Sequence, residues 1–132
     1  MIRRNFLVLA ASSALILPGL LQAQNRSAAG TVQATAAQID ELLRGNTITG
    51  TWGNSTYTQY FDASGFTVYI ADGRPPSRGK WRVKEDTDQY DSWWENTGWT
   101  AYTVVMTNKG YAWVNGDTLE YFQVLDGKQA DF

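Results

Sequence analysis

From Thr47 onward, apolar and polar residues alternate along the chain, and this alternation constrains the fold more than any other feature. In the first such run, Ile48, Gly50 and Trp52 alternate with threonines. Consecutive side chains of a β-strand point to opposite faces of a sheet, so a run of this kind predicts a strand with one buried face. The period of two argues against helices in this part of the chain, since a helix needs a period of 3.6.

The same pattern predicts seven further strands. They are expected at residues 57–61, 66–70, 79–83, 90–94, 99–106, 111–114 and 119–125. Turns rich in Asp, Asn and Gly separate them, and Asn115-Gly116 is the strongest hairpin signal. Because no long crossover segment could join parallel strands, we expect a mainly β fold, an antiparallel up-and-down meander of about eight short strands. An open sheet would expose two edges, which favours a sheet that is curled or closed into a small barrel.

One short helix is predicted ahead of the strands, over residues 36–44. Thr35 and Gln38 have the spacing of a capping box, in which each side chain satisfies a backbone amide of the other residue. Ile39 and Leu43 fall on one face of this helix. A helix of this length is marginal in isolation, so we expect its apolar face to dock on the sheet.

The first 23 residues have the layout of a secretory signal peptide, with Arg3 and Arg4 ahead of an apolar run. This run is shorter than the roughly 20 apolar residues needed to cross a bilayer, which disfavours a membrane anchor. Arg3-Arg4-Asn5-Phe6-Leu7 resembles a twin-arginine export signal, and an ordinary secretion signal is the alternative. We therefore expect an exported chain, periplasmic or secreted, with a flexible leader at 24–34 and one β domain at 35–132.

Composition excludes several classes of function. Two of the 11 basic residues lie in the predicted signal, which leaves 9 against 13 acidic residues and argues against nucleic-acid binding. The sequence contains neither histidine nor cysteine, so the usual nucleophile–base pairs and zinc sites are unavailable to it. We expect no metal and no cofactor. Without disulfides, stability must come from burial of the six Trp, seven Tyr and five Phe.

The tryptophans near residue 95 are the strongest candidates for a binding site. Trp93 and Trp94 are adjacent, so they point to opposite faces of a strand and are both core only if both faces are covered. Trp93 would share its face with Asp91 and Glu95, close to Trp99, an arrangement suited to stacking against a ligand. The alternative is that the helix or a second copy of the chain covers this face. The candidate ligand-binding residues are Tyr90, Asp91, Trp93, Glu95 and Trp99.

Two charged segments are expected to be solvated rather than to bind ligands. Every second residue of one strand is basic, which places four cations on one face: Arg78, Lys80, Arg82 and Lys84. This stripe could meet an anionic ligand or membrane surface, but pairing with carboxylates such as Glu120 is the favoured interpretation. The acidic run at 85–91 lacks the central Gly and terminal Glu of a calcium loop, which favours a solvated turn.

Several short motifs carry a resemblance to known proteins. Residues 42–47 and 79–83 match the patterns LLxGNT and GxWRV, and residues 60–65 resemble the pattern YFxxDG, with Ser64 in place of its Asp. The chain therefore resembles small exported alphaproteobacterial proteins of unassigned function over residues 39–128, which implies the architecture but no catalytic residues. The strands containing Gly50-Thr51-Trp52 and Gly79-Lys80-Trp81 also resemble lipocalin-like barrels, and we expect both tryptophans to be core. The small exported proteins that this chain resembles often carry a cysteine pair, and at the aligned positions this sequence has Asp91 and Ala101.

These observations favour a noncatalytic periplasmic or secreted β-barrel that binds a small molecule, a glycan or an envelope protein. The binding region would be the one around Trp93 and Trp99, or the barrel mouth. A purely structural or stress-related envelope protein is the alternative, and a hydrolase using Asp91 with Glu95 comes third. The sequence is compatible with a monomer or a homodimer.

Overall fold

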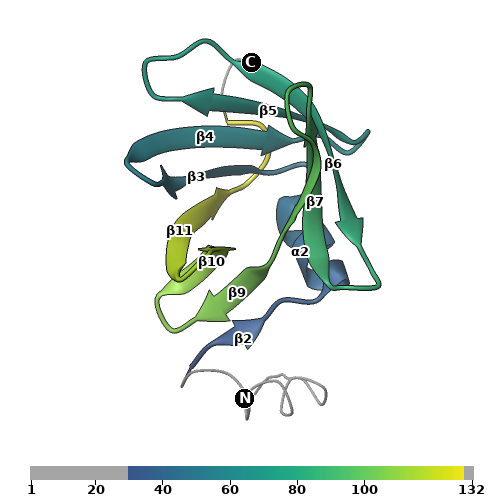
Figure 1. The fold of residues 1–132 in the computed structure, drawn as a ribbon, viewed down its shortest axis with the longest axis vertical. Coiled ribbons are helices and arrows are strands. Elements are labelled where there is room, and N and C mark those ends of the chain that lie inside the picture. The colour runs from purple at the N-terminus through teal and green to yellow at the C-terminus, as the bar shows by residue number, and fades with distance from the viewer. Residues whose placement is uncertain (1–29, 130–132) are drawn as a thin grey trace, which may run out of the picture.

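The computed structural model describes residues 30–129 of the 132-residue chain, and within them the fold is mainly β with one short helix (Figure 1). The predicted signal peptide lies outside the described residues. In chain order the elements are β2 (Val32–Gln33), α2 (Ala36–Leu43), β3 (Thr47–Trp52), β4 (Ser55–Phe61), β5 (Phe66–Ala71), β6 (Ser77–Lys84), β7 (Gln89–Trp94), β8 (Gly98–Tyr102), β9 (Val104–Thr107), β10 (Gly110–Asn115) and β11 (Thr118–Leu125). In this part of the chain no helix has the length and apolar character needed to cross a membrane.

The strands form one antiparallel sheet, curled into a half-barrel, in the order β2-β9-β10-β11-β3-β4-β5-β6-β7-β8. This confirms the predicted meander. The predicted strand at 99–106 is divided at Thr103, since β8 pairs with β7 whereas β9 pairs with β10. The pairing of β9 with β10 extends to this bend, where the amide of Val114 donates a hydrogen bond of 2.9 Å to the Thr103 carbonyl. A strand that changes neighbours must bend, which explains the division.

The segment predicted as a flexible leader ends earlier than expected. Val32–Gln33 forms β2, which pairs with β9, and Ala34 is buried. A strand of two residues has no detectable period, so the sequence pattern could not show it. β2 forms because the edge of β9 supplies partners for its backbone hydrogen bonds.

Helix α2 begins where its sequence predicts and ends one residue earlier than expected, at Leu43. The Thr35 hydroxyl accepts a hydrogen bond from the Gln38 amide, and the Gln38 side chain accepts one from the Thr35 amide, so the capping box is confirmed. Ile39 and Leu43 are fully buried in the core. Asp88, in the turn before β7, accepts a hydrogen bond of 2.8 Å from the first helical amide. The helix therefore packs against β6 and β7 at the end of the sheet where β7 begins.

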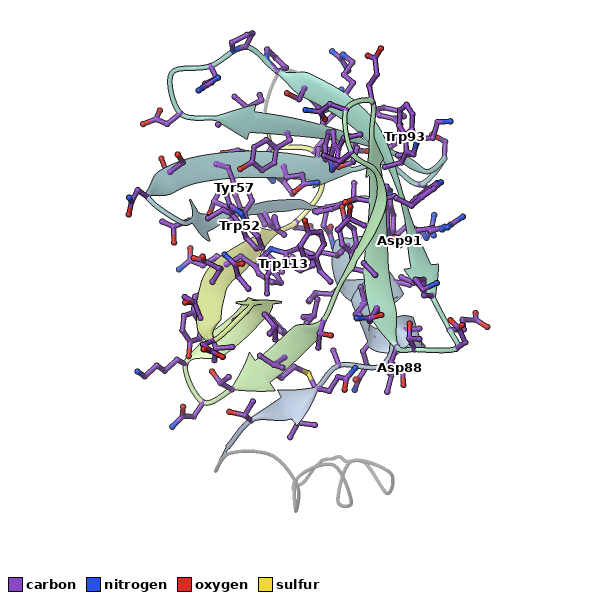
Figure 2. The ribbon with its side chains drawn as sticks, viewed as in Figure 1. Trp52, Tyr57, Asp88, Asp91, Trp93 and Trp113 are labelled. Carbon is purple, nitrogen blue, oxygen red and sulfur yellow. The ribbon has the colours of Figure 1, made fainter. Side chains whose placement is uncertain are left out.

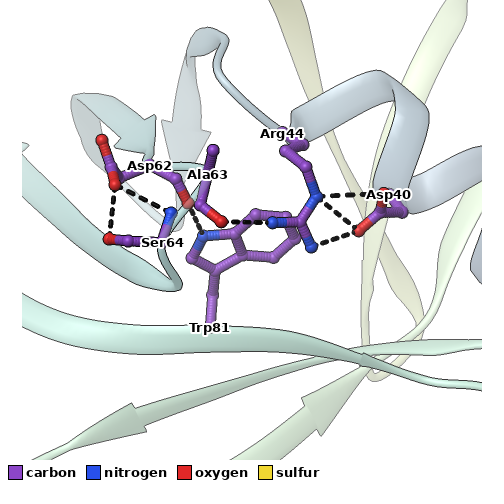
Figure 3. Close-up of polar contacts among 6 residues, drawn as sticks. All are labelled: Asp40, Arg44, Asp62, Ala63, Ser64 and Trp81. Carbon is purple, nitrogen blue, oxygen red and sulfur yellow. Dashed lines mark hydrogen bonds and ion pairs between the residues drawn. The ribbon is translucent and has the colours of Figure 1, made fainter.

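Arg44, directly after α2, ties the helix to the turn between β4 and β5 (Figure 3). Its guanidinium forms an ion pair with Asp40 at 2.6 Å and donates to the Ala63 carbonyl at 2.6 Å. The same group lies 4.7 Å from the ring centroid of Trp81, whose indole N–H donates to the Asp62 carbonyl at 2.9 Å. Trp81 is buried, as predicted, and its only polar atom is satisfied.

Two strand glycines allow neighbouring backbones to approach closely, as the Gly-x-Trp pattern predicts. A Cβ atom at Gly50 would lie 2.6 Å from the Tyr121 carbonyl oxygen, and one at Gly79 would lie 2.4 Å from that of Trp93. No side chain fits in either place. Trp52, two residues after Gly50, was expected in the core. It is only partly buried, and it packs beside the core and lines a cavity.

Candidate functional site

The concave side of the sheet forms an open cavity of about 740 Å³ at the end away from α2. Trp52 at the end of β3, Ser77 at the start of β6 and Trp94 at the end of β7 contribute to it, and these strand ends lie together. Its walls are mostly aromatic: Trp52, Tyr57, Tyr69, Tyr90, Trp94, Tyr102 and Trp113. Ligand pockets usually span roughly 300–1,000 Å³ and are lined by apolar and aromatic side chains with a few placed polar groups, which describes this cavity.

Contacts between the rings hold the cavity walls in place. Tyr57 stacks on Tyr69 with ring centroids 5.0 Å apart, and Tyr69 meets Trp94 edge-on at 6.2 Å. On the other side, Tyr90 and Trp113 lie 4.8 Å apart. Ring pairs of this geometry add about 0.5–1.5 kcal/mol each beyond area burial, so the walls are largely preformed.

A buried polar cluster lines the cavity at Gln59. The Gln59 side-chain nitrogen donates to the Thr67 hydroxyl at 2.9 Å and to the Tyr90 hydroxyl at 3.3 Å. Burial raises the pKa of Tyr90 well above its ordinary value, although its hydrogen bonds with Ser92 and Gln59 oppose the shift. The phenol is therefore neutral at physiological pH. The cluster offers hydrogen-bonding groups without charge.

Two indole N–H groups in the cavity wall are also satisfied by hydroxyls. Trp113 donates to the Tyr57 hydroxyl at 2.9 Å, and Trp94 donates to the Ser92 hydroxyl at 3.2 Å. Burial is the main cause of the raised pKa of Tyr57. Charged side chains occur only at the rim among the described lining residues, where Arg78 and Glu95 are exposed. The interior of the cavity is thus polar in places and uncharged.

The structure divides the five predicted site residues between the two faces of the sheet, and Figure 2 labels two of them, Asp91 and Trp93 on β7. Tyr90 lines the cavity, whereas Asp91, Trp93 and Trp99 belong to the outer face. Glu95 was expected beside Trp93 but lies at the cavity rim, since β7 ends one residue earlier and the alternation stops there. The predicted residues therefore do not form one site.

The outer-face residues join a row that we call the outer ridge, defined as Phe66, Lys80, Trp93 and Trp99. They are direct cross-strand neighbours on β5, β6, β7 and β8. Phe66 and Trp99 are 40% and 41% exposed, and the Lys80 ammonium lies 4.9 Å from the ring centroid of Trp93. Arg82, one pair further along, places its guanidinium 3.7 Å from the ring centroid of Trp99. Aromatic rings and cations thus alternate on this face.

Lys80 and Arg82 of the basic stripe lie on the outer face of β6 as predicted, whereas Arg78 lines the cavity rim. The carboxylate expected to pair with the stripe was wrong. Arg82 pairs with Asp91 on β7, with 2.8 Å between Nε and Oδ2, and the Asp91 side chain is almost fully buried. Glu120 lies on β11, which adjoins β10 and β3 instead of β6. Its carboxylate accepts hydrogen bonds from the Gly53 amide and the Asn115 side chain, both at 3.0 Å.

Three of the carboxylates considered for metal binding or hydrolysis either have other partners or lie far from one another. Asp88 caps α2, and Asp91 is committed to Arg82 on the outer face while Glu95 lies at the cavity rim. Within residues 30–129 no three His, Cys, Asp or Glu side chains lie close enough together to hold a metal ion.

Most of the cavity residues were missed by sequence reasoning. Tyr57, Gln59, Tyr69, Tyr102 and Trp113 line it without having been singled out. Their inward direction follows from strand alternation, which was the available signal. Their convergence depends on which strand ends meet, and the alternation within each strand does not indicate this.

Fold and site together define a curled β-sheet protein with an aromatic cavity inside it. Comparison with known proteins adds nothing to this class: no family model, no curated protein and no solved structure matches the chain. The resemblance to small exported proteins stays a prediction.

Proposed function

We propose that this chain is a noncatalytic binding protein that takes up a small, largely apolar molecule in its cavity. The observation that carries the proposal is the cavity of about 740 Å³ with seven aromatic side chains in its walls and an uncharged polar cluster inside. An apolar ring entering this space would exchange water for ring contacts on several sides.

The lining residues favour binding over catalysis. A nucleophile needs a base within hydrogen-bond reach, and the partners of Ser92, the buried hydroxyl in the cavity, are the Trp94 indole and the neutral Tyr90 hydroxyl. The tyrosines have raised pKa values because they are buried, which makes them poor bases near neutral pH. With the predicted export signal, the proposed place of action is the periplasm or the exterior of the cell.

A titration with the uncharged fluorophore N-phenyl-1-naphthylamine tests the proposal. We expect saturable fluorescence enhancement by the mature protein, weakened about tenfold in Trp52→Ala and Trp94→Ala, which corresponds to about 1.4 kcal/mol. Trp99→Ala, on the outer ridge, is the matched control and should bind like the parent. Circular dichroism checks that each variant is folded. Loss of binding in Trp99→Ala with retention in both cavity variants would refute the cavity as the site.

The outer ridge favours a second candidate function, docking of an anionic envelope component such as an acidic glycan. The chain is acidic overall, yet this face combines Lys80 and Arg82 with Phe66 and Trp99, the two large apolar side chains that are exposed within residues 30–129. Titration with polygalacturonate, with neutral dextran as the control, should show binding that Trp99→Ala and Lys80→Ala weaken. If neither the fluorophore nor the polymers bind, a purely structural role becomes the better explanation.

A further inference from the structure

Two buried side chains that line the cavity have part of their hydrogen-bonding capacity unmet. Gln59 and Tyr57 are 6% and 5% exposed, and both lie on β4. They are two residues apart, so they face the same side of the sheet with roughly 7 Å between them along the strand. Unmet polar groups at such depth are uncommon, because each loses its hydrogen bonds to water on burial.

The orientation of the Gln59 amide follows from its neighbours. The Thr67 hydroxyl donates to the Tyr60 carbonyl at 2.8 Å, so its oxygen can only accept from Gln59. The nitrogen of Gln59 must therefore face Thr67, and its second hydrogen goes to the Tyr90 hydroxyl. Both donors are used. The side-chain oxygen of Gln59 accepts no hydrogen bond from any described residue, which leaves a buried acceptor in the cavity wall.

The Tyr57 hydroxyl has the opposite need, because it lacks an acceptor for its hydrogen in the described part of the chain. The indole of Trp113 can only donate, so the Tyr57 hydroxyl acts as its acceptor at 2.9 Å. The hydrogen of Tyr57 is left over, and no acceptor for it occurs among the described residues. Because burial raises the pKa of Tyr57, this hydrogen is retained at physiological pH. The cavity thus presents one free acceptor and one free donor from the same strand.

We propose that the cavity selects an uncharged, ring-containing molecule that carries an O–H or N–H donor for Gln59 and an acceptor atom for Tyr57. This inference rests on the proposed function and adds the chemical class of the ligand. A charged group inside would have no partner, since Arg78 and Glu95 lie at the exposed rim. A sugar would bring hydroxyls on every side, more than these two unmet groups could satisfy.

Calorimetry with 2-naphthol and 2-methoxynaphthalene tests the donor directly. The two probes share their rings and an acceptor oxygen, but only 2-naphthol can donate a hydrogen bond. We expect the parent protein to bind 2-naphthol about tenfold more tightly, a preference that reflects a buried acceptor left unpaired by the ether. In Gln59→Met, which keeps the side-chain length and removes the amide, the affinity ratio should fall to about one.

Two tyrosine variants complete the test. Tyr57→Phe should weaken both probes to a similar extent, since both carry the acceptor oxygen. Tyr111→Phe is the matched control, because Tyr111 is partly buried and stacks on Phe122 but does not line the cavity. It should leave both affinities and their ratio unchanged. If Gln59→Met does not fold, the preference of the parent still tests the donor requirement, and Tyr57→Phe still tests the acceptor requirement.

The outcomes separate this inference from the proposed function. If both probes bind the parent equally, the donor requirement is wrong while the cavity remains a binding site. If the preference survives in Gln59→Met, the donor pairs elsewhere and the assignment to Gln59 is overturned. If neither probe nor N-phenyl-1-naphthylamine binds, the proposed function fails and the inference fails with it.

Discussion

Replacing Gly79 with alanine should destabilise the protein and weaken its cavity at the same time. The added Cβ atom would lie 2.4 Å from the Trp93 carbonyl oxygen and 2.7 Å from the nearest ring atom of Trp94. Unstrained contacts between heavy atoms lie near 3.5 Å or more, so β6 and β7 would have to separate by about 1 Å. Because the first obstacle is backbone, a change of side-chain rotamer cannot relieve the clash.

The expected magnitude follows from three opposing effects. Overpacking in a tight site costs about 1–3 kcal/mol, and a weakened ladder hydrogen bond adds about 1 kcal/mol. Reduced freedom of the unfolded chain returns about 0.4–1 kcal/mol. A net loss of about 2 kcal/mol in the free energy of unfolding should lower Tm by about 8–16 °C in a domain of this size.

Urea and thermal denaturation, followed by tryptophan fluorescence, measure this change for Gly79→Ala. Lys80→Ala, at the next residue but on the outer face, is the control and should lose less than about 1 kcal/mol. Binding of N-phenyl-1-naphthylamine should weaken in Gly79→Ala alone, since Trp94 is displaced. A stability within about 0.5 kcal/mol of the parent would refute the close approach of β7 to Gly79.

Three further perturbations follow from single contacts. Asp88→Ala removes the acceptor at the start of α2 and leaves a non-glycine residue at φ 54°, so urea denaturation should show a loss of about 1–2 kcal/mol, and less for Asp88→Asn. Tyr57→Phe leaves the Trp113 indole N–H buried without its acceptor, and the free energy of unfolding should fall by about 1–3 kcal/mol. Hydrogen bonds from Ser64 lower the pKa of Asp62, so its stabilising contribution is complete above the unfolded pKa of about 3.9 and is lost as pH falls through the lower folded value. Urea midpoints between pH 5 and pH 2.5 should therefore depend less on pH in Asp62→Asn.

Features that depend on neighbouring residues in the sequence were predictable. The capping box of α2 needs only Thr35 and Gln38, and the inward direction of Tyr90 and Trp94 needs only the period of one strand. Trp81 was placed in the core for the same reason. The mainly β meander followed because short turns between such strands leave antiparallel pairing as the simplest connection.

Features that depend on which strands meet were not predictable from one sequence. Glu120 was assigned to the basic stripe because charge alone suggested it, whereas its strand adjoins β3 and β10. The bend at Thr103 sends one predicted strand to two different neighbours. The gathering of Tyr57, Gln59 and Trp113 around one space is of the same kind, since β4 and β10 are separated by two strands in the sheet.

The cavity exists because large and small inward side chains are unevenly distributed along the curled sheet. At the end near α2, inward positions carry bulky residues such as Phe61 and Trp81, which pack into the closed core. At the other end, β6 and β7 place Ser77 and Ser92 inward, and these two residues fill little volume. The larger rings there contact one another around the open space, and two of them, Trp113 and Tyr57, are joined by a hydrogen bond. A sheet selected for stability alone would gain from larger apolar residues at these small positions, so the unfilled volume favours a role for the space itself.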